Sequence, residues 1–255
     1  MLDLTAIVDA LGAEACRFDV ELLAECDSTN LWLLARAERG APSGTVVIAE
    51  AQTAGRGRHG RLWHSTPGDS LTFSLLWRFA PATPPLGLSL AAGVAVTNAL
   101  AKIGAGETAL KWPNDVLKDG RKLAGILVEL VPGAPHAAVI GIGLNLRLPA
   151  ALPDELRAHS AALDASVDPN TLLAALLVEL RATLETFATA GFGALRDAWL
   201  ARHAYQDAQV RLLSDFAPPR AGICRGVDET GALLLETAGG IERILSGEIS
   251  LRGAT

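Results

Sequence analysis

A short run of alternating glycines and arginines is the feature that most constrains this 255-residue chain. Residues 52–63 read QTAGRGRHGRLW. Glycine lets a backbone adopt positive φ and approach a ligand closely, while arginine brings a permanent charge and a planar fork of donors. The run therefore predicts a loop that can fold over an anion. Its glycines are Gly55, Gly57 and Gly60, and its arginines are Arg56, Arg58 and Arg61.

The loop stands between two apolar segments. Residues 45–50 (TVVIAE) form a β-branched run typical of a buried strand, and residues 70–77 (SLTFSLLW) predict a second strand. On its own residues, the loop could equally be an RGG-like element that grips RNA or a solvated surface loop. The formal net charge of −6, from 22 basic and 28 acidic residues, is unfavourable for general nucleic-acid binding. This context favours a structured anion site.

The composition is that of a globular protein with a sizeable core. Half of the residues are hydrophobic, which is enough for a sizeable core. The length of 255 residues is enough for one large domain or for a large and a small one. The three cysteines are odd in number and include no CxxC pair, which predicts no disulfide framework, no zinc site and a reducing cytoplasm. The first residues lack the pattern of a signal peptide. The apolar stretch 86–100 is too short to span a bilayer, so we expect a buried helix and no membrane contact.

Hydrophobic periodicity and turn signals predict an α+β fold, a mixed β-sheet with helices packed on it. Asp119-Gly120 is a strong two-residue hairpin signal, and Asp168-Pro169 is a cap followed by a first-turn proline. The expected strands are 20–26, 45–50, 70–77, 109–111, 116–118, 121–129 and 137–144. The expected helices are 31–40, 86–103, a leucine-striped helix from 168 and 192–203.

The pattern changes after Tyr205. Short strands are expected at 210–213, 222–227, 232–236 and 241–245, separated by turn residues such as Gly239-Gly240. We expect a catalytic domain over residues 1–206 and a small separate β-barrel over residues 207–255. There is no GxGxxG after a first strand and no GxxxxGK[ST] motif, so neither usual nucleotide loop is predicted.

Three further segments carry candidate chemistry. Residues 111–115 (KWPND) place a lysine, an amide and a carboxylate within five residues, which could serve a carboxylate substrate, a nucleotide and Mg²⁺. Taken alone, however, the segment is better explained as a plain β-turn. Residues 141–145 (GIGLN) place an amide at a strand end, or simply end the strand. Residues 27–30 (DSTN) are expected to cap a helix, and cap hydroxyls can also meet a ligand there.

Together these segments resemble the biotin–protein ligases. The matching motifs are Asp27-Ser-Thr-Asn30, Gln52 to Arg58 with Gly60, Arg61 and Trp63, Lys111 to Asp115, Lys122 to Glu129 and Gly141 to Asn145. The C-terminal segment is similar to the small barrel of that family. The resemblance runs from about residue 20 to the end. It implies a class II synthetase-like (biotin–lipoate ligase) catalytic domain and an SH3-like barrel.

The resemblance also implies an activity. Biotin would be activated by ATP, with Mg²⁺, to biotinyl-5′-AMP and then transferred to a lysine of a biotin carboxyl carrier protein. The implied catalytic residues are Lys111, Arg58 and Asp115, with Asp115 also a candidate Mg²⁺ ligand. The implied biotin-binding residues are Ser28, Thr29, Asn30, Gln52, Gly55, Arg56, Gly57, Arg58, Lys111 and Gly125. The implied nucleotide-binding residues are Arg58, His59, Arg61, Trp63, Asn114 and Asn145.

The chain departs from the family pattern in a few places. His59 stands where some members carry arginine, so the loop carries less charge. About twenty residues precede the catalytic domain, too few for the winged-helix domain of repressor-type members, so we expect the short form without DNA binding, as a monomer or a homodimer. We expect residues 53–65 to be mobile without ligand and ordered with it. A lipoate–protein ligase, an RNA-binding module and a catalytically idle biotin sensor are the alternatives.

Overall fold

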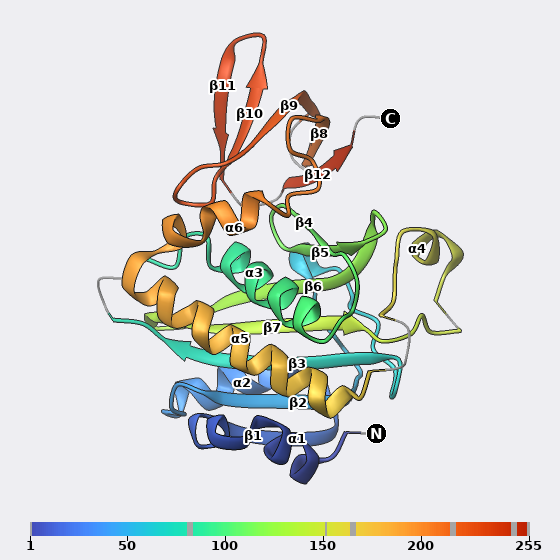
Figure 1. Cartoon of the computed structure of the whole chain (residues 1–255), viewed down its shortest axis with the longest axis vertical. Coiled ribbons are helices and arrows are strands. Elements are labelled where there is room, and N and C mark those ends of the chain that lie inside the picture. The colour runs from blue at the N-terminus through green and yellow to red at the C-terminus, as the bar shows by residue number, and fades with distance from the viewer. Residues whose placement is uncertain are drawn as a thin grey trace.

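The computed structural model describes residues 2–80, 84–150, 152–163, 167–214, 218–245 and 249–253. Its centre is a seven-stranded sheet with the order β1-β2-β3-β7-β6-β5-β4 (Figure 1). Only the β1–β2 pair is parallel, which confirms the expected mixed sheet. The strands are β1 Asp19–Cys26, β2 Thr45–Gln52, β3 Ser70–Arg78, β4 Ala109–Lys111, β5 Asp115–Lys118, β6 Arg121–Val131 and β7 Ala134–Asn145.

The β5–β6 hairpin confirms the Asp119-Gly120 turn. Both turn residues have positive φ, 51° and 71°, as a type I′ turn requires. A register shift after Val116 leaves Leu117 opposite Lys122 and Asp115 opposite Gly125. The hairpin therefore brings Lys122 back toward the KWPND segment.

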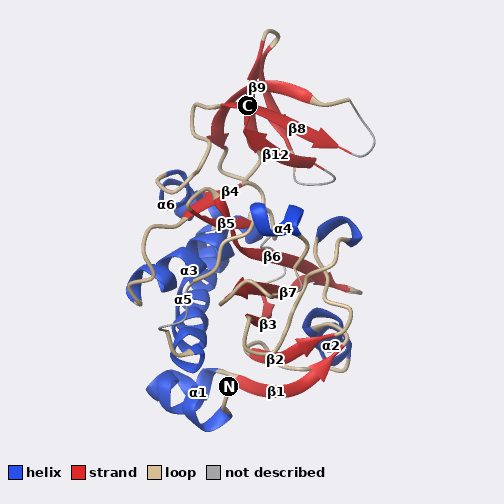
Figure 2. Ribbon diagram, turned by 90° about the vertical axis from the view of Figure 1, so that its right-hand side faces the viewer, coloured by secondary structure: helices blue, strands red, loops and turns tan. Residues whose placement is uncertain are grey.

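Helices cover both faces of the sheet (Figure 2). α3 (Leu88–Lys102) and α5 (Pro169–Ala190) pack together on one face, and α2 (Thr29–Glu38) lies on the other. The leucine stripe of α5 is buried, and the side chain of Asp168 accepts from the Thr171 amide at its start, as predicted. The remaining elements are α1 Leu4–Leu11, α4 Asp154–Ala158, α6 Arg196–Leu200 and the 3₁₀ turns η1 Gly12–Arg17, η2 Arg58–Gly60 and η3 Phe192–Leu195.

One expectation about the helices was wrong, and two helices were not predicted. The helix expected over 192–203 is a 3₁₀ turn, η3, followed by the five-residue α6. The chain leaves the helix because its backbone pairs with the sheet edge: Leu110 donates to the Arg202 carbonyl and accepts from the Ala204 amide. α1 and α4 were not predicted. α4 has only five residues, too few for a clear helical periodicity, and α1 precedes the first recognisable motif.

The two faces of β3 differ in chemistry. Leu71, Phe73 and Leu75 join the main hydrophobic core. The alternating residues Ser70, Thr72 and Ser74 are also buried, with 6%, 1% and 0% of their surface exposed. Successive strand residues point to opposite faces, so these hydroxyls lie on the face opposite the core helices.

A second, five-stranded antiparallel sheet follows and confirms the expected small β unit. Its order is β11-β10-β9-β8-β12, and its last strand was not predicted from the sequence as a strand. The proposed boundary at 206/207 falls in the turn that leads into β8. The strands are β8 Gln209–Ser214, β9 Arg220–Val227, β10 Leu233–Thr237, β11 Gly240–Ile244 and β12 Ile249–Gly253.

This unit packs directly against the larger sheet. The indole of Trp112, in the KWPND segment, donates to the Gly231 carbonyl at 3.1 Å, and Arg196 donates to the Val227 carbonyl at 2.7 Å. One continuous hydrophobic cluster includes core residues of both parts, such as Leu100 and Leu233. Within the described residues, no helix is long and apolar enough to cross a membrane.

Candidate functional site

A pocket of about 510 Å³ lies beside the Gly/Arg loop and the start of α2. It brings together nearly all of the residues singled out from the sequence. Those that line it are Ser28, Thr29, Asn30, Gln52, Arg56, Gly57, Arg58, His59, Arg61, Trp63, Lys111, Asn114, Asp115, Gly125 and Asn145. Gly55 does not line it. A Cβ there would lie 2.5 Å from the Trp63 carbonyl oxygen, so this glycine lets the loop close on itself.

The Gly/Arg loop folds as a small hairpin. The Trp63 amide donates to the Gly55 carbonyl at 2.9 Å, and the Gly57 amide donates to the Arg61 carbonyl at 2.7 Å. His59 and Gly60 form the tip with φ of 59° and 68°, a region that glycine tolerates far better than histidine. The loop is therefore a hairpin arm beside the pocket.

The start of α2 forms one end of the pocket. Ser28 occupies the N-cap position, which confirms that this segment caps a helix, but its side chain makes no cap hydrogen bond. The first free helix amide, that of Thr29, instead donates to Gln52 Oε1 at 2.8 Å. A side chain from the neighbouring strand thus satisfies the helix end, and the Ser28 and Thr29 side chains are left for other partners.

A chain of buried polar contacts continues from Thr29. Ser74 Oγ lies 2.8 Å from Thr29 Oγ1 and 2.6 Å from Asn30 Oδ1. Asn30 Nδ2 donates to Glu129 Oε2 at 2.8 Å and to the Leu127 carbonyl at 3.3 Å. Sequence reasoning missed Ser74, although the hydroxyls at alternate positions of residues 70–74 are a visible signal on a strand otherwise made of core residues.

Glycines on β7 make room for this end of the pocket. The side chain of Asn30 lies on Gly141, and any Cβ there would overlap Asn30 Oδ1. A Cβ on Gly143 would likewise overlap the Trp63 indole. The glycines of the GIGLN motif therefore admit side chains from α2 and from the loop onto the sheet.

The indole of Trp63 lies against the backbone of Gly143 and next to Gly125. A Cβ on Gly125 would be 3.3 Å from its ring, and Lys122 Nζ lies 5.8 Å from the ring centroid. Its indole nitrogen is buried without a hydrogen-bond partner among the described residues. The indole thus lies next to Gly125, which the resemblance assigns to biotin. The assignment of Trp63 to the nucleotide stays a prediction.

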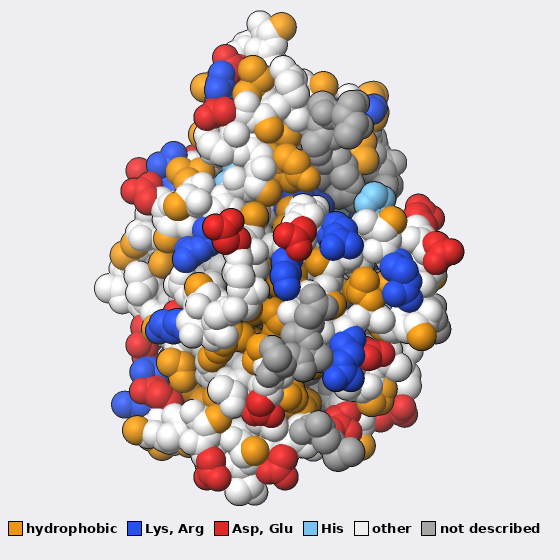
Figure 3. Space-filling model, turned by 45° about the vertical axis from the view of Figure 1, so that its right-hand side comes forward, with side chains coloured by type: hydrophobic (Ala, Val, Ile, Leu, Met, Phe, Trp, Pro, Cys, Tyr) orange, Lys and Arg blue, Asp and Glu red, His pale blue; other side chains and the backbone are white. Residues whose placement is uncertain are grey.

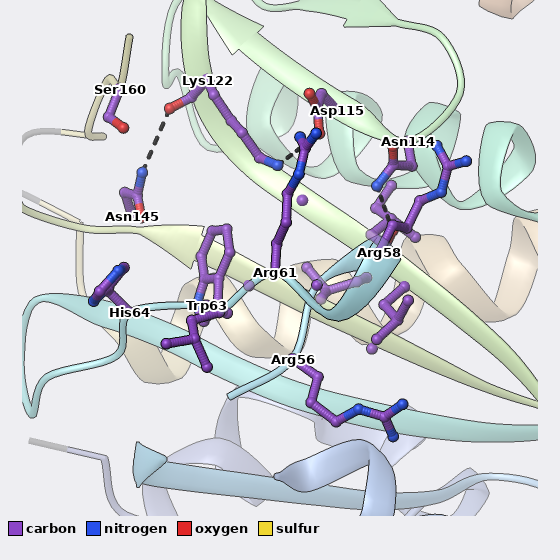
Figure 4. A pocket seen from close by; sticks show the side chains of 18 of the residues that line it. Arg56, Arg58, Arg61, Trp63, His64, Asn114, Asp115, Lys122, Asn145 and Ser160 are labelled. Carbon is purple, nitrogen blue, oxygen red and sulfur yellow. Dashed lines mark hydrogen bonds and ion pairs between the residues drawn. The ribbon is translucent and has the colours of Figure 1, made fainter. Parts of the chain in front are cut away.

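Asp115 is the centre of a group of charges at the other end of the pocket (Figure 4). Lys122 Nζ lies 2.7 Å from one carboxylate oxygen and Lys111 Nζ 3.2 Å from the other. Only 13% of the Asp115 side chain and 12% of the Lys111 side chain are exposed. Burial would raise the pKa of Asp115, but the two lysines outweigh burial and hold it below its usual value.

Arginines of the loop approach this group from the side. Arg58 donates to Asn114 Oδ1 at 3.3 Å, and Asn114 Nδ2 donates to the Ile126 carbonyl at 2.9 Å. Burial lowers the pKa of Arg58, and the nearby Asp115 carboxylate opposes this effect. Arg56 points away from the Asp115 group (Figure 4) and pairs with Glu129 at 3.2 Å.

Two family models match the chain. Residues 23–145 match the biotin/lipoate A/B protein ligase family, and residues 210–252 match the biotin protein ligase C terminal domain. The bifunctional ligase/repressor BirA of Escherichia coli is 41% identical over 242 residues, which cover 92% of this chain and 74% of that protein. The chain belongs to the biotin protein ligase family.

Other relatives of this ligase agree in length and fold. The biotin–[acetyl-CoA-carboxylase] ligase of Mycobacterium tuberculosis is 38% identical, with 97% of this chain and 95% of that protein covered. A structure of the biotin protein ligase from Aquifex aeolicus in complex with biotin and ATP is 32% identical, with a TM-score of 0.80. The matched region covers 92% of this chain and 99% of the Aquifex aeolicus chain. These comparisons confirm the expected family and fold.

Sequence reasoning quoted Lys122 in a motif of this ligase but gave it no role. The structure pairs it with Asp115 and places it beside Trp63. The signal was the Asp119-Gly120 hairpin, because a two-residue turn returns the second strand directly alongside the first. Lys122 thus adds a second lysine to the one expected at position 111.

Asn145 has a structural task in this ligase. Its Nδ2 donates to the Ala161 carbonyl at 3.0 Å and to the Lys122 carbonyl at 3.4 Å. It therefore joins the segment after α4 to the end of β7 and to the hairpin. These two bonds occupy the amide nitrogen, so only the amide oxygen of Asn145 is left to contact a nucleotide. That contact stays a prediction.

The donor set around Asp115 does not fit a resident metal ion. Each carboxylate oxygen faces a lysine ammonium group. Among the described residues, no three His, Cys, Asp or Glu side chains gather in a group that could hold a metal. A metal bound by Asp115 would have to displace an ammonium group.

Proposed function

We propose that this ligase activates biotin with ATP and transfers the biotinyl group to a lysine of a biotin carboxyl carrier protein. The observation that carries the proposal is one pocket with a neutral hydrogen-bonding end, at Thr29 and Gln52, and a cationic end, at Lys111 and Lys122. Biotin has the same division, with a neutral ureido ring and a carboxylate. The names of the relatives support biotin as the acyl group.

In the first half-reaction, a carboxylate oxygen of biotin attacks the α-phosphorus of ATP. The new P–O bond gives biotinyl-5′-AMP, and the bond to pyrophosphate breaks. A carboxylate must approach a polyanion, so fixed positive charges have to offset the repulsion. We expect Lys111, Lys122, Arg58 and Arg61 to supply them, with Asp115 holding the two lysines in place. His59 adds a further donor at the loop tip.

In the second half-reaction, the amine of the carrier lysine attacks the acyl carbon. The C–O bond of the mixed anhydride breaks, AMP leaves with the bonding electron pair, and the proton of the amine passes to the departing phosphate or to water. Because its low pKa makes Asp115 a weak base, we expect it to orient Lys111 and Lys122 rather than to accept the amine proton. The loop of residues 55–63 is placed to shield the adenylate from water. We expect this activity in the cytoplasm, without DNA, from a monomer or a homodimer.

Mg²⁺ is expected to arrive with the phosphates of ATP. It usually keeps several waters and is held by substrate phosphates with one or two carboxylates. When bound, it would supply additional positive charge to the phosphates. The lysines of the Asp115 group would provide the protein's own share.

The rivals lack support from the site. Octanoyl transferases of this relationship use a cysteine nucleophile, but Cys26 and Cys224 are buried, Cys16 is remote in the chain, and none lines the pocket. For RNA binding we would expect a continuous basic surface. On the face shown in Figure 3, basic side chains are interspersed with acidic ones.

The direct test is incubation of the ligase with biotin, ATP, Mg²⁺ and a carrier domain, followed by mass spectrometry of the carrier. One added biotinyl group is expected, with AMP and pyrophosphate released. Parallel reactions with lipoate and octanoate test the nearest rival. An unmodified carrier in the presence of bound biotin would instead favour the idle sensor.

A further inference from the structure

We propose that Ser74 is a positioning residue that fixes the direction of the Thr29 hydroxyl hydrogen. The consequence is that Thr29 Oγ1 presents a hydrogen-bond acceptor to the pocket. The inference rests on the proposed function only in taking biotin as the ligand. It follows from counting donors and acceptors along the buried contacts from Glu129 to Thr29.

The chain of contacts starts at Glu129, whose carboxylate can only accept hydrogen bonds when ionised. Arg56 pairs with its Oε1 at 3.2 Å. Its Oε2 lies 2.8 Å from the Asn30 amide, and the Leu127 carbonyl, another pure acceptor, lies 3.3 Å from the same nitrogen. Two acceptors on one side fix the amide nitrogen of Asn30 there, so its oxygen faces Ser74.

The next two contacts follow from this orientation. Asn30 Oδ1 has no hydrogen, so across the 2.6 Å contact the Ser74 hydroxyl must donate. Ser74 has then used its only hydrogen. The 2.8 Å contact between Ser74 Oγ and Thr29 Oγ1 still needs a hydrogen between the two oxygens. Thr29 must therefore donate to Ser74.

The hydroxyl of Thr29 is thereby committed. Its hydrogen points to Ser74 rather than to Gln52 Oε1, which lies farther away at 3.3 Å and already accepts from the Thr29 amide. Thr29 lines the pocket, so a lone pair of its oxygen is left for a ligand N–H. Gln52, whose amide oxygen is occupied, keeps its nitrogen as a donor.

This pattern matches the ureido ring of biotin, which has N–H donors and one carbonyl acceptor. Burial makes the pattern hard to change, since Ser74, Asn30 and Thr29 are 0%, 3% and 4% exposed. Water cannot easily replace a partner that is lost, and a buried polar group without a partner is costly. Ser74 is thus a specificity-determining residue although Thr29 lies between it and the ligand.

A double-mutant cycle tests the inference, with the biotin Kd measured by calorimetry. We expect Ser74→Ala to weaken biotin binding by about tenfold, the usual scale of one hydrogen bond. Thr29→Val should weaken it by at least as much. In the Thr29→Val background, Ser74→Ala should then cost less than about twofold, because Ser74 has no hydroxyl left to orient. The KM for ATP should not follow these changes.

Thr97→Val is the matched control. It also removes a fully buried hydroxyl, but one that bonds only to carbonyls of its own helix, α3, and does not line the pocket. Its biotin Kd should equal that of the wild type. Melting temperatures monitor folding, and Ser74→Cys, with a weak donor of similar size, replaces Ser74→Ala in the cycle if the alanine variant does not fold.

Additive losses in the cycle, or a Ser74→Ala variant with full biotin affinity, would overturn the role of Ser74. The wild type separates this failure from that of the proposed function. A wild type that biotinylates a carrier while the cycle is additive refutes only the role of Ser74. A wild type that does not bind biotin refutes both.

Discussion

At the scale of single residues, the site depends on a few side chains held by opposite charges and hydrogen bonds. Asp115 holds two lysines at once, and Glu129 holds Arg56 and Asn30. Asp115 thus links the KWPND segment to Lys122 of β6, and Glu129 links β6 to the Gly/Arg loop and to α2. Removing one cation should therefore affect chemistry more than folding.

Lys111→Ala is expected to lower the rate of adenylate formation by about 10²–10³-fold, the usual effect of removing one preorganised donor. Asp115 keeps Lys122 as a partner, so the melting temperature should change little. ATP–pyrophosphate exchange measures the rate. Lys118→Ala is a control in the same hairpin, because Lys118 does not line the pocket. Wild-type exchange in Lys111→Ala would refute the assignment.

Gly141→Ala is expected to weaken biotin binding by tenfold or more. The new methyl group would overlap Asn30 Oδ1 and push that side chain away from Ser74. Gly193→Ala offers a control, because its Cβ would meet nothing closer than 3.8 Å. Equal biotin affinities of the two variants would show that the close approach of Asn30 to the strand is unimportant.

At the scale of elements, local patterns in the sequence predicted well and tertiary pairing did not. The Asp119-Gly120 hairpin, the leucine stripe of α5 and the Asp168 cap all depend on near neighbours, and the structure confirms them. The helix expected over 192–203 ends early because the backbone of Leu110, far away in sequence, forms hydrogen bonds with the backbone of Arg202 and Ala204. Local propensity holds no information about that partner.

The same division explains what sequence reasoning missed in the site. The site residues implied by the resemblance line the pocket, apart from Gly55. Ser74 lies on a strand that looked like plain core, and its role depends on α2, about 45 residues earlier. Lys122 could have been placed through the hairpin register. Asn145 turned out to join backbone segments, which no local pattern shows.

The Gly/Arg loop should respond to ligand as one element. A protease that cuts after arginine should cleave the ligand-free protein within residues 56–61 and cleave it more slowly once biotin and ATP are bound, because closure over the adenylate orders the loop. Digestion followed by mass spectrometry gives the cleavage rates. Arg17, which is exposed and does not line the pocket, is an internal control. Equal loop cleavage with and without ligands would contradict closure.

At the scale of the whole molecule, the larger sheet and the C-terminal unit behave as one packed body. The Trp112 indole, next to Lys111, donates to the Gly231 carbonyl of the C-terminal unit. Figure 1 shows that unit above the β4 edge, with α6 beside it. A substitution at this junction should therefore lower the stability of the fold and also shift the strand that carries Lys111.

His203 makes this junction sensitive to acid. It is 8% exposed and packs against Trp199, with ring centroids 4.4 Å apart. Burial lowers its pKa from 6.5 to about 4, with the Gln206 side chain opposing. Between those values the unfolded chain binds a proton that the folded one does not, so stability is full above pH 6.5 and falls as the pH drops toward 4.

The expected loss from His203 over this range is about 3 kcal/mol, from 1.36 kcal/mol per unit of pKa. Urea unfolding at pH 7 and pH 4.5 measures it. His203→Leu should reduce the difference between the two pH values, while His136→Leu, on β7 and away from the junction, should not. A His203→Leu variant as acid-sensitive as the wild type would contradict the role of this histidine.

The central claim is that one pocket holds the two ends of an acyl-adenylate at two chemically different sites. A crystal structure of the protein with biotin and ATP tests it most directly. We expect the ureido ring at Thr29 and Gln52 and the α-phosphate among Lys111, Lys122 and Arg58. An adenylate bound elsewhere, or these cations turned away from it, would contradict the account.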